Sequence, residues 1–244
     1  MIKINNDLKK LRLTIDNIDT KIASLISERI ETVKQVGEIK KHKKNFYVPE
    51  REKNIFKSLS EEFPHMDKNI IKSIFVEIIS GCRSFEKTFD VGVLENTYSL
   101  SALRNILGSF TNNYIFENAH ALEKKYNSLD YALFSLDVNS ISLVEKLQDI
   151  FIINYCIYEN MRFFLFGKTE NSDIVSGKAG FLLKKNNFAK IEDRLYNLSY
   201  NIEDFSNEYI FLEIDFNENN SIEEIKNILS VPHKYLGIYP NNNF

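Results

Sequence analysis

The sequence is poor in cysteine, proline and glycine, and it contains no tryptophan. Its two cysteines, Cys82 and Cys156, are too few for a disulfide framework or a cysteine-based zinc site. The 4 histidines are scattered without the spacing that metal ligands show, so we expect no metal centre. With only 8 glycines and 4 prolines, long segments are left uninterrupted, and helices can extend over them.

A charge excess of one sign and long apolar runs are also missing. The 31 Lys and Arg residues nearly balance the 34 Asp and Glu residues, so the net charge of -3 does not favour nucleic acid or an anionic membrane as a partner. No apolar run approaches the roughly 20 residues of a membrane span. The first ten residues lack the apolar core of a signal peptide. We therefore expect a cytoplasmic protein.

Three helices are predicted over the first 87 residues. Apolar side chains recur every three or four positions between residues 8 and 25, which is the period of a helical stripe. This first helix, over residues 7–41, would be about 50 Å long, too long for a small domain to cover. It must therefore pack against a partner or a second copy of the chain. A proline suits the start of a second helix at 49–62, and an aspartate can cap a third at 67–87.

The remaining residues alternate between strand and helix patterns, which indicates α/β structure. Strands are expected at 91–94, 131–135, 150–158 and 162–166, and helices near 99–107, 118–126 and 140–148. From residue 177 onward, strands are expected at 179–184, 189–198, 209–216 and 234–239, with a helix at 221–229. The sequence thus predicts a multidomain chain: an all-α three-helix domain over 1–89, an α/β lobe over 90–170 and an α+β domain over 171–244.

The predicted helices carry charged residues whose spacing brings them together. Arg29 continues the apolar row of the first helix, and Lys40 points within about 20° of it. Arg12 projects about 100° away from that line. Further polar side chains open the second helix and lie one turn apart on the third: Arg51, Glu52, Cys82 and Glu86. Three cations could converge on a small dianion inside a helical bundle, and the alternative is that all are solvated charges on amphipathic helices.

The order of these residues resembles the AroQ class of chorismate mutases over residues 7–87. The similarity is carried by three patterns: L-x-x-L-R-x-x-I-D-x-I-D-x-x-I-x-x-L-I-x-E-R, V-G-E-I-K and P-E-R-E. It implies an intertwined, all-helical homodimer in which the long first helix spans both active sites. It also implies a pericyclic rearrangement of chorismate to prephenate without a metal or a cofactor.

The resemblance also implies the roles of individual residues. Arg12 of the partner subunit, Arg29 and Arg51 would hold the substrate carboxylates, because a planar guanidinium binds a carboxylate through two hydrogen bonds. Lys40 would donate to the breaking ether oxygen and to a carboxylate, and Glu52 would bind the ring hydroxyl. The implied catalytic residues are Lys40, Glu86 and Arg29.

Three positions depart from the family pattern. Val48 stands where the family often has aspartate, and Cys82 replaces a serine, which is a better hydrogen-bond donor. Glu86 replaces a glutamine that donates to the ether oxygen. An ionised carboxylate cannot donate, so we expect activity that is shifted to acidic pH.

Residues 90–240 resemble a shortened prephenate dehydratase followed by a shortened ACT regulatory domain. The dehydratase likeness is carried by V-G-V-L-E-N-T-Y-S-L-S-A-L, L-D-Y-A-L-F-S-L-D and N-M-R-F-F-L-F-G, which follow one another in the family order. Only about seventy residues separate the opening strand from Arg162, enough for one of the two dehydratase lobes. Met161 replaces the threonine of the family's T-R-F motif. We expect no dehydratase activity.

The ACT-like segment is reduced in the same way. The family's first helix and turn, which contact phenylalanine, would fall between Leu183 and Ala189, where only K-K-N-N-F remains. The ending L-G-I-Y-P matches the family well. The resemblance leaves three residues in the effector motif: Glu192, Asp193 and Arg194. These losses argue against phenylalanine as an effector, and its binding stays open as an alternative.

The leading interpretation is a chorismate mutase of phenylalanine biosynthesis with an inactive dehydratase-like tail. One alternative is a bifunctional mutase/dehydratase whose second site is completed by other residues or by another chain. Another is a non-catalytic regulatory protein that keeps the mutase fold. The cations at Arg12, Arg29, Lys40 and Arg51 argue against the last alternative, because a scaffold has no need to bury charge.

Overall fold

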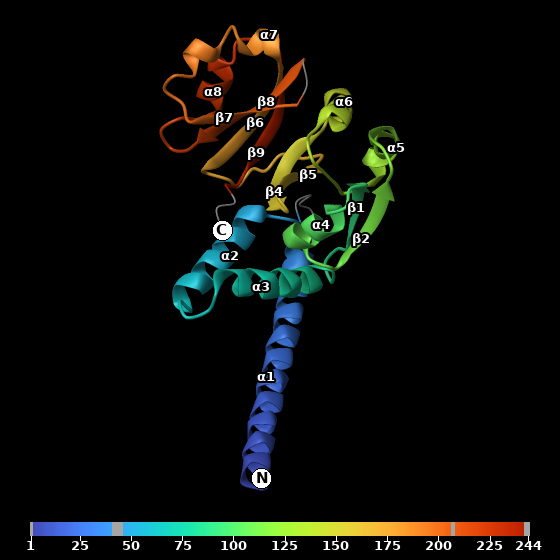
Figure 1. Cartoon of the computed structure of the whole chain (residues 1–244), viewed down its shortest axis with the longest axis vertical. Coiled ribbons are helices and arrows are strands. Elements are labelled where there is room, and N and C mark those ends of the chain that lie inside the picture. Colours follow the sequence, from blue (N-terminus) through green and yellow to red (C-terminus); the bar gives the residue numbers. More distant parts are fainter. Residues whose placement is uncertain (1, 41–45, 206–207, 242–244) are drawn as a thin grey trace.

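The computed structural model describes residues 2–40, 46–205 and 208–241, with side chains of the first segment described for residues 6–39. Three helices come first: α1 (Ile2–Lys40), α2 (Pro49–Glu62) and α3 (Lys68–Arg83). α3 packs against both α1 and α2, and α1 projects far beyond them (Figure 1). Every side chain from residue 6 to residue 25 is exposed, including the apolar stripe. This helix therefore buries only its C-terminal part within its own chain.

Local sequence explains where the two shorter helices begin. Pro49 occupies the first turn of α2, where a missing N–H costs nothing. Asp67 caps α3 by accepting hydrogen bonds from the N–H groups of Asn69 at 2.8 Å and Ile70 at 3.3 Å. The predicted start of α2 and cap of α3 are confirmed. α3 ends at Arg83 and not near residue 87, because the chain turns there and the Glu86 N–H donates to the Arg83 carbonyl at 2.8 Å.

A five-stranded mixed sheet follows, in the order β2-β1-β3-β5-β4. Its strands are β1 (Phe89–Leu94), β2 (Thr111–Phe116), β3 (Tyr131–Phe134), β4 (Phe151–Tyr158) and β5 (Met161–Gly167). β1 runs parallel to β2 and β3, whereas β5 is antiparallel to β3 and β4. Helix α4 (Ser99–Leu107) covers one face, and α5 (Ala119–Lys125) and α6 (Val138–Lys146) cover the other. A short helical turn, η1 (Tyr126–Ser128), follows α5.

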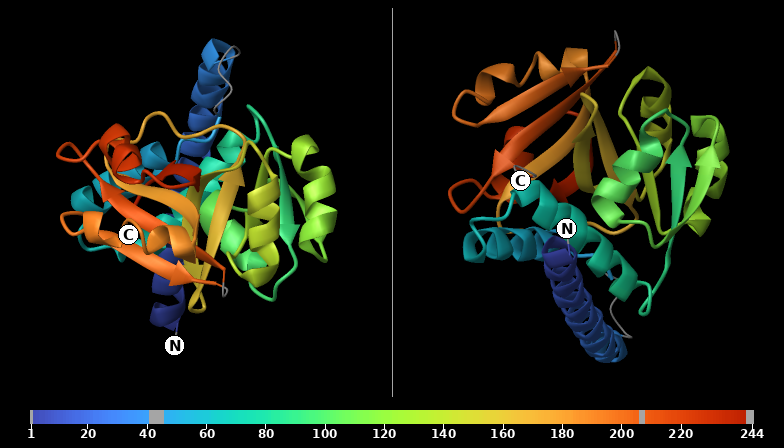
Figure 2. Two further views of the ribbon diagram at one scale, coloured as in Figure 1. Left: turned by 90° about the horizontal axis from the view of Figure 1, so that it is seen from above. Right: turned by 60° about the horizontal axis from the view of Figure 1, so that its bottom comes forward.

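The C-terminal residues form a four-stranded antiparallel sheet in the order β7-β8-β6-β9. Its elements are β6 (Gly177–Lys184), α7 (Lys185–Phe188), η2 (Glu192–Arg194), β7 (Tyr200–Asp204), β8 (Tyr209–Phe216), α8 (Ile222–Ile228) and β9 (His233–Tyr239). One face of this sheet has its own core, and the other face adds Leu182, Phe211 and Tyr239 to the core of the α/β lobe. Figure 2 shows the two sheets side by side above α2 and α3. The two sheets therefore share a hydrophobic core.

One predicted strand is absent, and two observed strands were not predicted. Residues 189–198 do not form a strand, because Ile191 and Leu195 are buried four residues apart in consecutive helical turns that include η2. β2 and β7 were not predicted, because both are edge strands whose side chains are mostly exposed. Among the helices that the structure describes, none has the length and apolar character needed to cross a membrane.

Candidate active site

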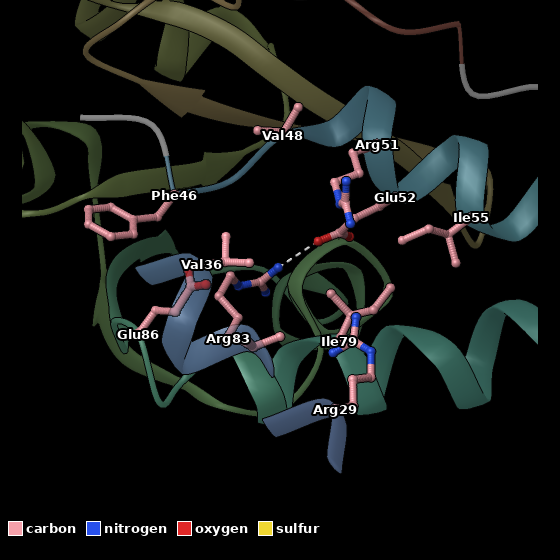
Figure 3. Close-up of a pocket in the computed structure, with 11 residues that line it drawn as sticks. Arg29, Val36, Phe46, Val48, Arg51, Glu52, Ile55, Ile79, Arg83 and Glu86 are labelled. Atoms are coloured by element: carbon pink, nitrogen blue, oxygen red, sulfur yellow. Dashed lines mark hydrogen bonds and ion pairs between the residues drawn. The ribbon is translucent and has the colours of Figure 1, made fainter. Parts of the chain in front are cut away.

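A cavity of about 200 Å³ lies where the C-terminal part of α1 meets α2 and α3 (Figure 3). Charged and apolar side chains from all three helices, from the segment before α2 and from the turn after α3 form its walls. The lining residues are Arg29, Val33, Val36, Phe46, Val48, Arg51, Glu52, Ile55, Ile79, Arg83 and Glu86. Three guanidinium groups and two carboxyl groups therefore face a space of small-molecule size.

Two of the arginines are free to bind an anion. Arg29 is half-buried on α1, and Arg51 is exposed in the first turn of α2. In the described part of the chain, neither guanidinium is hydrogen bonded or paired with a carboxylate. A guanidinium without a partner in a concave site can take a carboxylate through two parallel hydrogen bonds. The pair is suited to a ligand that carries carboxylates.

Glu52 is buried and already has one partner. Its Oε1 accepts a hydrogen bond from Arg83 Nη1 at 2.6 Å, and both side chains are about nine-tenths buried or more. Burial raises the pKa of Glu52 to about 7, although the positive charges of Arg83 and Arg29 act in the opposite direction. The carboxyl group can therefore change its ionisation near neutral pH.

Arg83 was missed by the sequence reasoning. It is the last residue of α3, and its side chain points into the space between α3 and the α/β lobe. Its Nη2 donates to the Leu107 carbonyl at 2.8 Å, and its guanidinium lies over the rings of Tyr47 and Phe89, at 5.3 and 5.0 Å from their centroids. The sequence does contain a signal for Arg83, namely a cation at the end of a largely apolar helix face. The same kind of signal identified Arg29.

Glu86 lines the cavity from the turn that follows α3. A Cβ atom on Gly37 would lie 3.1 Å from Glu86 Cγ, so the absence of a side chain on Gly37 allows this close approach. Glu86 was expected one helical turn after Cys82 on α3, which is wrong because α3 ends at Arg83. Cys82 is 1% exposed and does not line the cavity.

Three further residues were predicted for the mutase site: Val48, Arg12 and Lys40. Val48 lines the cavity and accepts the N–H of Arg51 with its carbonyl at 3.1 Å, at the start of α2. Arg12 lies on the exposed part of α1, about 25 Å along the axis from Arg29, and does not reach this chain's cavity. Lys40 is the last residue of α1, but its side chain lies outside the described residues.

The residues singled out in the C-terminal part lie apart from this cavity. Glu192, Asp193 and Arg194 form the exposed turn η2, where Arg194 donates to Ser230 Oγ at 2.5 Å. Arg162 forms two hydrogen bonds with Glu213 and a third with Glu203 at 2.8 Å. Burial alone would raise the pKa of Glu213, but the hydrogen bonds and charge of Arg162 outweigh it and lower the pKa below its usual value.

Metal binding finds no support among the residues that the structure describes. No group of three or more His, Cys, Asp and Glu side chains is arranged there to hold an ion.

The cavity lies in a part of the chain that matches a known protein family. Residues 11–87 match the family described as chorismate mutase type II, and this match includes every described residue of the cavity wall. The N-terminal part of the chain is a chorismate mutase domain. Over 98 residues the chain is 41% identical to a bifunctional chorismate mutase/prephenate dehydratase of Aquifex aeolicus, covering 36% of this chain and 26% of that protein.

A second relative has the same description. The bifunctional chorismate mutase/prephenate dehydratase of Stutzerimonas stutzeri is 34% identical over 106 residues, which cover 40% of this chain and 29% of that protein. The chain thus matches less than a third of the length of these relatives. Among solved structures, a prephenate dehydratase from Streptococcus mutans aligns with 62% of this chain and 97% of that chain, at 16% identity and a TM-score of 0.43.

Proposed function

We propose that the chorismate mutase domain catalyses the rearrangement of chorismate to prephenate. The observation that carries this proposal is the convergence of Arg29, Arg51, Glu52 and Glu86 on one cavity within the domain. The rearrangement needs no covalent intermediate. The enzyme must hold a flexible dianion in its reactive conformation and stabilise the charge that develops on the breaking ether oxygen.

The proposal gives the predicted site residues the following tasks. Arg29 and Arg51 bind the two carboxylates, and the buried carboxyl group of Glu52 accepts the ring hydroxyl. Glu86, when protonated, donates a hydrogen bond to the ether oxygen, and Lys40 is proposed as the second donor. Val48 contributes its backbone, and Cys82, which is buried and does not line the cavity, makes no contact with the substrate in this proposal. Arg12 completes the site from the partner subunit.

A homodimer is part of the proposal. The support is the exposed apolar stripe of α1, which ordinary soluble proteins cover. Leu11, Ile15 and Leu25 of this stripe are each more than half exposed, and Arg12 follows Leu11. A second α1 packed along this stripe would bury these residues and bring Arg12 to the neighbouring cavity.

The remaining residues are proposed to be a reduced dehydratase-like lobe over 90–170 and a reduced ACT-like domain over 171–244, neither of them catalytic. Two observations support the loss of dehydratase activity. Met161 has no hydroxyl, and the guanidinium of Arg162 is already occupied by Glu213 and Glu203. Phenylalanine binding at Glu192, Asp193 and Arg194 remains the weaker alternative, because these side chains are exposed.

The test is an assay of the purified full chain with chorismate, in which prephenate and phenylpyruvate are quantified separately. We expect enzyme-dependent prephenate, and phenylpyruvate no faster than prephenate decomposes without enzyme. Arg29→Ala should abolish most of the activity. Enzyme-dependent phenylpyruvate at neutral pH would favour a bifunctional enzyme, as the names of the relatives suggest. No consumption of chorismate would favour a non-catalytic role.

A further inference from the structure

Arg83 connects the mutase cavity to the α/β lobe. It is 6% exposed, and its guanidinium donates hydrogen bonds to two acceptors outside α3. Toward the cavity it holds Glu52 of α2, and toward the lobe it donates to the carbonyl of Leu107, the last residue of α4. The same group therefore contacts two parts of the chain that are 55 residues apart in sequence, at positions 52 and 107.

The geometry on the lobe side fixes the guanidinium. Tyr47 and Phe89 lie under it as aromatic faces, and these two rings also pack edge to face, with centroids 6.5 Å apart. Tyr47 is held in turn by Asn154 of β4, whose Nδ2 donates to the Tyr47 hydroxyl at 2.6 Å. Cation–aromatic contacts and a carbonyl acceptor restrict a guanidinium to one plane.

On the cavity side, one carboxylate oxygen of Glu52 remains available to a ligand. Arg83 binds Oε1, whereas Oε2 has no hydrogen-bond partner in the described part of the chain. Glu52 lines the cavity together with Arg29 and Arg51. A carboxyl group that is fixed through one oxygen presents the other in a defined direction, at no further entropy cost when a ligand binds.

We propose that Arg83 is a positioning residue of the mutase reaction, which holds the Glu52 carboxyl group so that Oε2 meets the ring hydroxyl of chorismate. This inference rests on the proposed function. It makes the α/β lobe a structural part of the mutase site, because α4 supplies the Leu107 carbonyl and the first residue of β1 supplies the Phe89 ring that hold Arg83. A hydroxyl contact made equally in the substrate and in the transition state affects KM and leaves kcat nearly unchanged.

The experiment measures kcat and KM for chorismate in full-length variants. Arg83→Met should raise KM about tenfold or more, the size expected when a hydrogen bond to a charged group is lost, with kcat within about threefold. Arg83→Lys should restore part of the affinity, because an ammonium keeps the charge but not the two-sided geometry. Lys87→Met is the matched control. Lys87 also ties the end of α3 to the lobe, through Asp130 at 2.5 Å, but it does not line the mutase cavity.

A double-variant cycle separates positioning from folding. In a Glu52→Gln background, Arg83→Met should change KM by less than about threefold, because the residue acts through the Glu52 carboxylate. The double variant also removes the uncompensated buried charge, so it provides a folded protein if Arg83→Met alone unfolds. Equal effects of Arg83→Met in both backgrounds, or KM values like those of Lys87→Met, overturn the inference and leave the proposed function intact. A parent protein that does not convert chorismate overturns both.

Discussion

Glu52 and Glu86 are two carboxyl groups that share one cavity but have different surroundings. Glu52 is buried and held by Arg83, whereas Glu86 is half-buried in a turn against Gly37. Burial raises the pKa of Glu52 to about 7 against the opposing charges of Arg83 and Arg29. Ionisation of Glu52 should therefore be visible in the free energy of unfolding.

The free energy of unfolding should decrease as the pH rises from about 5 to 8. A glutamate in the unfolded chain has a pKa of about 4.3, and in the folded chain the pKa of Glu52 is about 7. Below both values the group is protonated in either state. As the pH rises, the unfolded chain loses the proton first, which reduces the free energy of unfolding by up to about 3 kcal/mol. Urea denaturation at pH 5 and pH 8 measures this difference.

Glu52→Gln is the control for that measurement. An amide does not titrate, so the variant should show a smaller loss of stability between the two pH values. It should also be less stable than the parent at pH 8, because Arg83 loses its charged partner. A parent with equal stability at both pH values would contradict the prediction.

Glu86→Gln should raise turnover. The proposed role of Glu86 is to donate a hydrogen bond to the ether oxygen, which the amide of glutamine can do and an ionised carboxylate cannot. We therefore expect a higher kcat than in the parent at pH 8. Glu86→Ala has no donor, so its kcat should be on the order of a hundredfold below that of Glu86→Gln, as for other single donors to a transition state. Equal kcat values for the parent, Glu86→Gln and Glu86→Ala would exclude Glu86 from the reaction.

The sequence predicted the cavity residues that belong to the family pattern and missed Arg83, which does not. Arg29, Arg51 and Glu52 could be grouped from spacing and from the family pattern, and their roles stay predictions. Arg83 could not be grouped in this way. Its partners include Glu52 and Leu107, at distances of 31 and 24 residues along the chain. Spacing along one helix carries no information about contacts between separate elements.

At the scale of elements, one glycine fixes the connection between α4 and β2. Gly108 has a φ of +72°, and a Cβ atom there would overlap the side chain of Ser80 on α3. Gly108→Ala should therefore destabilise the protein by about 2 kcal/mol or more, the combined cost of a strained backbone and a steric clash. Thermal unfolding measures the loss.

Gly81→Ala is the matched control for that substitution. Gly81 is also adjacent to this junction, in α3, where its added Cβ would lie 3.4 Å from Phe110, an ordinary contact. Alanine is favoured over glycine inside a helix by about 0.5–1 kcal/mol, so this variant should be as stable as the parent or more stable. Equal losses in both variants would contradict the role given to Gly108.

The elements with strong local signals were predicted well, and those stabilised by distant contacts were not. α2 was predicted at its observed bounds because a proline and an apolar period mark it. β2 has neither alternation nor burial, and its pairing with β1 alone makes it a strand. Residues 189–198 contain alternating apolar positions, yet the turns around Ile191 and Leu195 bury these residues against the second sheet.

At the scale of the whole molecule, Arg162 joins the two sheets. It lies on β5 and binds Glu213 of β8 and Glu203 of β7. Glu213 is 1% exposed, and the Tyr239 hydroxyl donates to it as well. Glu213→Leu should lower the free energy of unfolding by about 3–5 kcal/mol, because it leaves the Arg162 charge buried without its main partner. Urea denaturation of the full chain measures this loss.

The double variant Arg162→Met/Glu213→Leu tests the reason for that loss. Replacing both charges by apolar side chains removes the unpaired cation, so most of the stability should return. Mutase activity should be unchanged in both variants, because neither residue lines the mutase cavity. A double variant that is less stable than Glu213→Leu would contradict this account.

Mixing two inactive variants should restore activity if sites are shared between chains. Arg12→Ala and Arg29→Ala should each be inactive alone, since each removes one arginine from every site. After the two proteins are unfolded together and refolded, a heterodimer contains one site with both arginines intact. We expect up to about half of the parent's activity per heterodimer in a chorismate assay. Verified heterodimers without activity would contradict the assignment of Arg12 to the neighbouring site.

If two chains pair along α1 as proposed, folding of this domain is a second-order process. Side chains from residue 6 to residue 25 are exposed in the described part of the chain, and an isolated helix of that length is only marginally stable in water. Backbone amides in this half of α1 should therefore exchange with solvent at a rate that falls as protein concentration rises, whereas those near Arg29 should be protected at any concentration. A newly made chain would form the wall of its own cavity without a partner. The N-terminal half of its first helix would become stable only after a second chain binds.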